Sequence, residues 1–116
     1  VKGRIIRVPR ASKEIAAFTF ADLCEQPRSA LDFLELSKRY RVIVLSNVPK
    51  MDDTRRDAAL RFVTLVDALY DNHIALVMSA AAAPQNLYTG TTHAGVFDRT
   101  VSRIMEMQSR TYRDAA

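Results

Sequence analysis

Two apolar runs with an amphipathic stretch between them dominate the middle of the chain. Residues 42–45 (VIVL) are continuously apolar and rich in β-branched side chains, and residues 74–80 (IALVMSA) form a second run of strand length. Such runs are typical of strands that are covered on both faces of a sheet. Between them, apolar residues recur at spacings of three and four, at Ala58, Phe62, Leu65, Val66, Leu69 and Tyr70. Residues 42–80 therefore predict a right-handed βαβ unit with parallel strands.

The ends of this central helix are marked by polar residues. Asp52, Asp53 and Thr54 offer side-chain oxygens that can cap a helix N-terminus, where acidic groups also favour the positive end of the helix dipole. The helix is predicted to run to about Tyr70, after which residues 71–72 (DN) turn the chain toward the second strand.

The segment before this unit predicts a β-hairpin. Arg4–Val8 and Glu14–Phe20 have strand character, and Pro9, Arg10, Ala11 and Ser12 are expected to connect them. This gives a basic N-terminal hairpin over residues 1–20, with Ala16, Phe18 and Phe20 on its apolar side.

Two further helices are predicted. Residues 21–41 begin with a helical turn at Ala21–Cys24 and continue as a helix over Ser29–Tyr40, with Pro27 suited to its first turn. Residues 81–116 hold a loop (84–95) and a helix (Phe97–Tyr112). The apolar stripe of this last helix is expected to be Phe97, Val101, Ile104, Met105 and Tyr112, with Arg99, Arg103, Glu106, Arg110 and Arg113 opposite.

Length and composition agree with one α/β domain or subdomain that spans residues 1–116 and has three main helices. The chain has 116 residues, of which 48% are hydrophobic and 26% charged, as in an ordinary globular domain. Its single cysteine, Cys24, excludes an internal disulfide. No apolar run approaches the ~20 residues of a membrane span.

The net charge of +4 comes from the N-terminal segment. Five of the 17 lysines and arginines precede the first acidic residue, Glu14, so that 12 basic residues face 13 acidic ones over the rest of the chain. Such a cluster either protects an exposed strand edge or contacts phosphate.

Several kinds of catalytic and metal site are not supported. The three glycines are scattered, and no Gly-Lys-Ser/Thr loop or dinucleotide-binding fingerprint occurs. His73 and His93 are too few and too far apart for a zinc site, so no metal ligands are predicted. We expect Cys24 to be a buried packing residue and His73 to be a turn residue.

Three places could carry function. Ser46, Asn47 and Ser79 lie at the carboxyl ends of the two buried strands, where ligands of open α/β sheets bind. The alternative is that these residues hydrogen-bond the turns that leave each strand. The arginine face of the last helix could meet phosphate or an acidic partner, or it could simply be solvated. Asp67 lies within the apolar part of the central helix and needs a partner, which predicts a pair with an arginine.

The order and spacing of several short motifs resemble ZapE-type ATPases, the bacterial relatives of the mitochondrial AFG-type, lactation-elevated ATPases. Residues 18–24 (FTFADLC) and 97–103 (FDRTVSR) carry most of the resemblance. It covers the chain from about Arg4 to Tyr112. The other matching positions are Pro27, Asp32, Phe33, Arg61, Phe62, Leu65, Asp67, Leu69, Tyr70, Asp71, Ser79, Ala80, Pro84, Leu87, Tyr88, Glu106, Met107, Ser109 and Tyr112.

The resemblance implies that the chain is the C-terminal portion of a longer P-loop AAA+ ATPase. ATP and Mg²⁺ would bind in the full-length parent, on a phosphate-binding loop upstream of this segment, and the fragment alone is expected to bind no cofactor and to be inactive. Arg99, Arg103 and Arg61 are the candidate nucleotide-sensing or finger arginines, and Asn47 and Ser79 are the candidate strand-end binding residues. Leu60 replaces the first of two arginines that relatives usually carry.

The resemblance also implies partners. These are the division protein FtsZ or another division-site protein, the remainder of the ATPase domain, and further copies in a homo-oligomer, in the bacterial cytoplasm. Mitochondrial relatives imply protein quality control instead. Two alternatives stay open: a non-catalytic partner-binding module that uses the arginine face, and nucleic-acid binding through the basic N-terminal segment.

Overall fold

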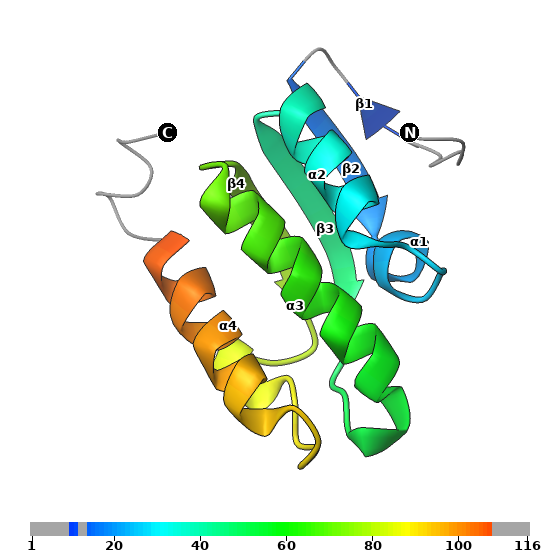
Figure 1. Ribbon diagram of the computed structural model, residues 1–116, viewed down its shortest axis with the longest axis vertical. Coiled ribbons are helices and arrows are strands. Elements are labelled where there is room, and N and C mark those ends of the chain that lie inside the picture. Colours follow the sequence, from blue (N-terminus) through cyan, green and yellow to red (C-terminus); the bar gives the residue numbers. More distant parts are fainter. Residues whose placement is uncertain (1–9, 12–13, 108–116) are drawn as a thin grey trace.

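A computed structural model describes residues 10–11 and 14–107, which form a four-stranded sheet with helices. The order of strands in the sheet is β1-β2-β3-β4, and α2 and α3 lie in front of it in Figure 1, with α4 alongside α3. The elements are β1 (Arg10–Ala11), β2 (Ile15–Thr19), α1 (Phe20–Cys24), α2 (Ala30–Arg39), β3 (Val42–Val48), the 3₁₀ turn η1 (Asp53–Arg55), α3 (Arg56–Asp71), β4 (Ala75–Ala80), the 3₁₀ turn η2 (Pro84–Asn86) and α4 (Ala94–Met107).

The predicted βαβ unit is confirmed, and a second one precedes it. β3 and β4 run parallel, with Val42 beside Ala75 and Leu45 beside Met78. β2 is also parallel to β3, with Ile15 beside Val42, so that α1 and α2 form a crossover of their own. The protein is therefore an α/β fold with three parallel strands.

The N-terminal hairpin is confirmed as an antiparallel pair, but its first strand differs from the prediction. β1 pairs with β2 through Arg10 opposite Ala17 and Ala11 opposite Ala16. Arg10 and Ala11 were expected in the connection and lie in the strand instead, because their backbone completes the edge of the sheet. The predicted strand at residues 4–8 lies outside the described residues.

Local hydrogen bonds fix the helix starts. Thr19 and Asp22 form a capping box that ends β2 and starts α1, one residue earlier than expected. Ser29 and Asp32 form a second box at α2, with the Ser29 backbone N–H 2.9 Å from Asp32 Oδ2. Pro27 precedes this box and does not lie in the first turn of α2, contrary to the prediction.

The same kind of cap starts α3. The Asp52 carboxylate accepts the Thr54 backbone N–H at 2.9 Å, and the chain continues through η1 into α3. The Thr54 hydroxyl also donates to this carboxylate, which lowers the pKa of Asp52.

The core lies between the sheet and the helices. Phe18, Phe33 and Phe62 are almost fully buried, together with Ile43 and Leu45 of β3. A row of aromatic rings links the helices: Phe62 lies 6.2 Å from Phe20 of α1 and 6.0 Å from Phe97 of α4, measured between ring centroids.

Within residues 10–11 and 14–107 the strands are covered on one face only, which corrects the expectation that β3 and β4 are covered on both. Along β3, Ile43 and Leu45 are buried, whereas Val42 and Val44, which point to the other face, are only partly buried. On β4 the side chain of Val77 is 55% exposed. Sequence pattern alone does not distinguish a strand with one covered face from one with two when both faces are apolar.

Helix α4 begins at Ala94, so the predicted loop is shorter than residues 84–95. Its buried residues are Phe97, Thr100, Ile104 and Met107. Met105, expected in the apolar stripe, is 52% exposed, because the buried stripe passes through Thr100, whose hydroxyl donates to the Val96 carbonyl. Tyr112, Arg110 and Arg113 lie outside the described residues. None of the described helices is long and apolar enough to span a membrane.

Candidate functional site

The two predicted strand-end residues lie together. The backbone N–H of Asn47 donates to Ser79 Oγ at 3.0 Å, across the ends of β3 and β4. They border a crevice of about 390 Å³ whose other lining residues are Val48, Pro49, Ala80 and Ala81. The prediction that the carboxyl ends of the parallel strands bring these residues together agrees with this arrangement, and their role in binding stays a prediction.

Asn47 has a left-handed backbone, with φ of 63°. Asparagine tolerates this conformation better than most residues. The pairing of β3 with β4 is interrupted between Leu45 and Val48, so Asn47 occupies a bulge that turns its N–H toward Ser79. Its side chain is exposed at the mouth of the crevice.

A hydrogen-bonded cluster around Asp53, which we call the Asp53 clasp, joins the start of η1 to the loop before α4. Asp53 Oδ1 accepts the backbone N–H groups of Thr92 at 2.9 Å and Thr91 at 3.0 Å, and Oδ2 accepts the Thr91 hydroxyl. These hydrogen bonds lower the pKa of Asp53 to about 2. The Tyr88 hydroxyl donates to the Thr92 carbonyl beside them. Gly90 is required here, because a Cβ would lie 2.5 Å from the Tyr88 ring.

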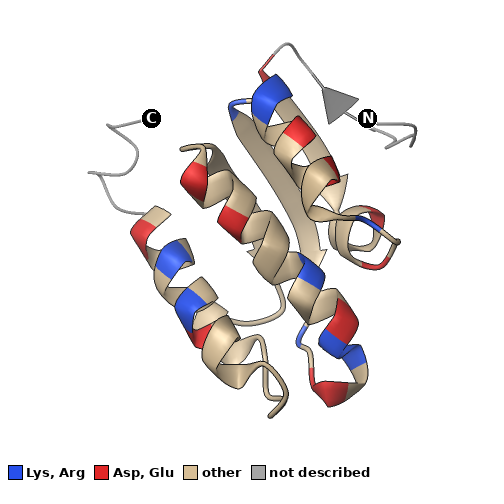
Figure 2. Ribbon diagram, in the orientation of Figure 1, with Lys and Arg blue, Asp and Glu red and all other residues tan. Residues whose placement is uncertain are grey.

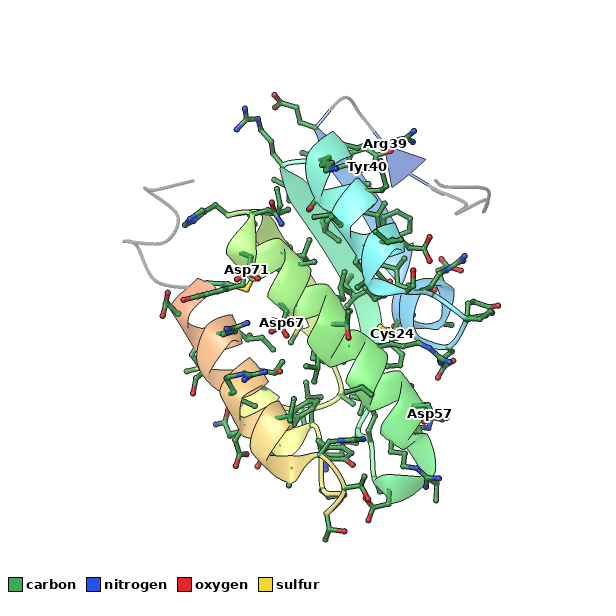
Figure 3. All side chains as sticks on the ribbon, viewed as in Figure 1. Cys24, Arg39, Tyr40, Asp57, Asp67 and Asp71 are labelled. Atoms are coloured by element: carbon green, nitrogen blue, oxygen red, sulfur yellow. The ribbon has the colours of Figure 1, made fainter. Side chains whose placement is uncertain are left out.

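Arg103 is held between α3 and α4. Its Nη1 lies 2.6 Å from Asp67 Oδ1, and its guanidinium lies 4.9 Å from the centroid of the Tyr70 ring. The Tyr70 hydroxyl donates to Glu106 Oε2, which raises the pKa of Tyr70. The predicted pairing of Asp67 with an arginine is confirmed, and Figure 3 shows Asp67 on the side of α3 that faces α4.

Arg99 lies one turn earlier on α4, which carries both basic and acidic residues (Figure 2), and is exposed. Within the part of the chain that the structure describes, it makes no side-chain hydrogen bond or ion pair. A free guanidinium of this kind can bind a phosphate or a carboxylate through two parallel hydrogen bonds.

Arg61 occupies a different surface. Its Nη1 donates to the Cys24 carbonyl at 3.1 Å, and it borders a cavity of about 320 Å³ between α2 and α3. Arg28, which the sequence did not single out, borders the same cavity and donates to the Asp22 carbonyl at 3.1 Å. Neither arginine forms an ion pair among the described residues, although Asp57 also lines the cavity.

The three candidate arginines do not converge. Arg61 faces α1, whereas Arg103 contacts the opposite side of α3, where α4 packs. The crevice at Asn47 and Ser79 is a third location, so any ligand that met all of them would have to extend over several surfaces of this chain. The contacts of Arg28 and Asp53 were missed because neither forms part of a periodic pattern.

The remaining candidate residues have structural roles. Cys24 is fully buried, and burial raises the pKa of its thiol to about 12. His73 adopts a left-handed backbone, with φ of 56°, in the turn that leads to β4, as predicted. No three histidine, cysteine or acidic side chains gather as a metal-binding group within residues 14–107.

Three parallel strands with helical crossovers place the chain in the class of open α/β domains. The family model described as AFG1-like ATPase matches residues 1–115, and the chain belongs to this family.

The chain is also similar to several individual proteins. The cell division protein ZapE of Escherichia coli is 38% identical over 97% of this chain and 30% of its own length. Lactation elevated protein 1 homolog B of Danio rerio is 31% identical over 97% of this chain and 29% of its own. An uncharacterized protein of Schizosaccharomyces pombe is 46% identical over 76% of this chain and 19% of its own. The chain thus spans less than a third of these relatives, and no solved structure matches it.

Proposed function

We propose that this chain is the carboxy-terminal module of an AFG1-like ATPase, in which it completes the nucleotide-hydrolysing core without carrying the triphosphate site. Membership of the family supports the ATPase assignment. The 116 residues contain no Gly-Lys-Ser/Thr loop, the element that cradles phosphates in P-loop enzymes. ATP and Mg²⁺ would accordingly be bound by other parts of a longer protein.

The described residues of this chain do not fit a magnesium site. Residues 14–107 offer no cluster of carboxylates or histidines as ligands, and Asp53 is already engaged by the N–H groups of Thr91 and Thr92. No step of hydrolysis is therefore assigned to a group that coordinates metal here. The role left for this chain is to supply an arginine that contacts a nucleotide bound by another part of the protein.

The unpaired guanidinium of Arg99 is the observation that carries this role. Arg103 is satisfied by Asp67, and Arg61 is tied to the Cys24 carbonyl, whereas Arg99 has no protein partner among the described residues. An arginine supplied to a phosphoryl group stabilises the charge of the transition state. Arg99 is thus our first candidate, in its own subunit or in a neighbouring one, with Arg103 and Arg61 behind it.

The test is ATP turnover by the full-length enzyme. Arg99→Ala should lower the rate by about 10³-fold if the guanidinium contacts the transferred phosphoryl group. Arg39→Ala removes another exposed arginine, at the far end of α2, and should leave the rate unchanged. Normal turnover in Arg99→Ala, Arg103→Ala and Arg61→Ala alike would overturn the arginine role.

The module should hydrolyse no ATP in isolation, because it lacks the phosphate-binding loop. Magnesium-dependent turnover by a purified 116-residue chain would contradict the proposal as a whole. This outcome is independent of the arginine variants.

A second candidate function is partner binding without catalysis. Exposed Arg99 and the 52% exposed Met105, both on α4, favour it, since arginine and methionine are enriched at interfaces. An acidic division-site protein, with FtsZ as the example implied by resemblance to ZapE, would fit this surface in the bacterial cytoplasm. Nucleotide-independent capture of FtsZ by the full-length protein, lost in Arg99→Ala with ATP turnover intact, would favour this function. Nucleic-acid binding depends on N-terminal residues outside the described ones and stays a prediction.

A further inference from the structure

The face of the sheet that points away from α2 and α3 is apolar, and no helix or strand among the described residues covers it; we call it the open face. The register of the strands places its residues in two adjacent rows. The side chains of Ile15 and Val77 are 46% and 55% exposed, and the other positions are partly buried. The first row is Ile15, Val42 and Ala75, and the second is Ala17, Val44 and Val77.

The composition of the open face indicates apolar contact rather than contact with water. None of its six positions carries a charged or polar side chain. Where one face of a sheet is solvated, strands usually alternate between apolar and polar residues, and here they do not. Parallel sheets joined by helical crossovers are almost always covered by helices on both faces.

The polar residues of the sheet mark where this apolar surface ends. The next row toward the carboxyl ends of the strands holds Thr19 and Ser46, side by side, and Ser79 follows Val77 on the same face of β4. Ser79 is the residue that accepts the N–H of Asn47 at the crevice. A layer that covers the apolar rows would therefore stop at the crevice and form its second wall.

We propose that an apolar helical layer, formed by the part of the longer AFG1-like polypeptide that this chain does not include, packs on the open face and closes one side of the Asn47–Ser79 crevice. This inference rests on the proposed function as a module of a longer ATPase. It is supported by the relatives, of which the chain matches only 19–30%. Most of a family polypeptide is thus available to supply the missing layer.

Two exposed apolar residues permit a matched test in the full-length protein. Val77 and Met105 are almost equally exposed in this chain, at 55% and 52%, but only Val77 lies on the open face. Each is replaced by cysteine, and the rate of maleimide labelling at that position is measured by peptide mass spectrometry under native conditions. Cys24 is buried and serves as an internal reference.

We expect Val77→Cys to react at least about tenfold more slowly than Met105→Cys in the monomeric full-length protein, because the covering layer must open first. Equal rates would overturn the proposal. A dimer that dissociates on dilution, with fast labelling of Val77→Cys in the resulting monomer, would also overturn it. The open face would then be covered by a second copy of the protein. Val77→Lys should in addition lower the melting temperature of the full-length protein, and Met105→Lys should not.

The test separates this inference from the proposed function. Fast labelling of Val77→Cys in a protein that hydrolyses ATP would rule out the covering layer but not the proposed function. Slow labelling in a folded protein that does not hydrolyse ATP would support the covering layer and contradict the proposed function.

Discussion

The Asp53 carboxylate orders the loop before α4, where its partners Thr91 and Thr92 lie 38 and 39 residues later in the chain. It accepts two backbone N–H groups and one hydroxyl from Thr91 and Thr92, while Tyr88 and Gly90 pack beside it. These donors lie at the start of α4, so the Asp53 clasp sets where this helix begins relative to α3. Two of the three donors are backbone N–H groups, which mutation cannot remove, so replacing the Asp53 carboxylate is the direct way to break the clasp.

Replacing Asp53 with asparagine removes the negative charge of the clasp, and this should change how the stability of the fold depends on pH. The pKa of Asp53 is lowered from 3.8 to about 2 in the folded chain, so the ionised form stabilises the fold above pH 3.8 and this contribution is lost as the pH falls toward 2. Urea denaturation should show Asp53→Asn less stable than the wild type at neutral pH, with the difference vanishing across that range. Asp98→Asn, on the exposed side of α4, controls for net charge. A difference that stays constant with pH would refute the assignment.

At the scale of elements, α4 is attached to α3 by both apolar and polar contacts. Phe97 stacks against Phe62, and Arg103 lies between Asp67 and the ring of Tyr70. Asp67 and Arg103 have side chains that are 30% and 28% exposed, so their attraction is screened less than that of a fully exposed pair. The Asp67–Arg103 ion pair thus helps to fix the orientation of α4 relative to α3 as well as attaching the two helices to each other.

A double-mutant cycle on Asp67→Ala and Arg103→Ala should give a coupling free energy of about 1 kcal/mol in urea denaturation. Arg103→Ala should cost slightly more than Asp67→Ala, because it also removes the contact with Tyr70. The exposed pair of Arg55 and Glu25, 3.0 Å apart, provides the control cycle and should couple more weakly. Additive effects of Asp67→Ala and Arg103→Ala would show that the two side chains do not interact in solution.

Elements that depend on neighbours in sequence could be predicted, and those that depend on distant partners could not. The spacing of Ala58, Phe62 and Leu69 is enough to indicate α3, since its buried stripe is a local property. The alternation of Ala16 and Phe18 indicates a strand, but a strand of either direction would show it. The parallel pairing of β2 with β3 therefore appeared only in the structure, as did the pairing of Arg10 and Ala11 with β2.

The candidate site divides in the same way. Asn47 and Ser79 could be brought together from the sequence, because parallel strands end at one edge of a sheet. The pairing of Asp67 was predicted from its apolar surroundings, but its partner, Arg103, lies 36 residues away and could not be chosen from several arginines. The place of Arg28 beside Arg61 at the same cavity could not be predicted from neighbouring residues, because it depends on how α1 and α2 pack.

At the scale of the whole molecule, the chain has a dense core on one side of its sheet and an apolar surface on the other. Cys24 lies within that core at zero exposure, next to α3. Its thiol reports on opening of the core, because a buried thiol whose pKa is raised to about 12 reacts only after it meets water.

Labelling of Cys24 should therefore be limited by unfolding rather than by the reagent. At about pH 8 we expect the native chain to react orders of magnitude more slowly than the chain in denaturant. Phe62→Ala should raise the native rate strongly, since loss of a fully buried ring costs ~3–5 kcal/mol. Leu31→Ala should leave it nearly unchanged, because that side chain is 59% exposed. Rapid labelling of the folded wild type would mean that the packing between α1 and α3 opens locally, and the core would then not act as one cooperative unit.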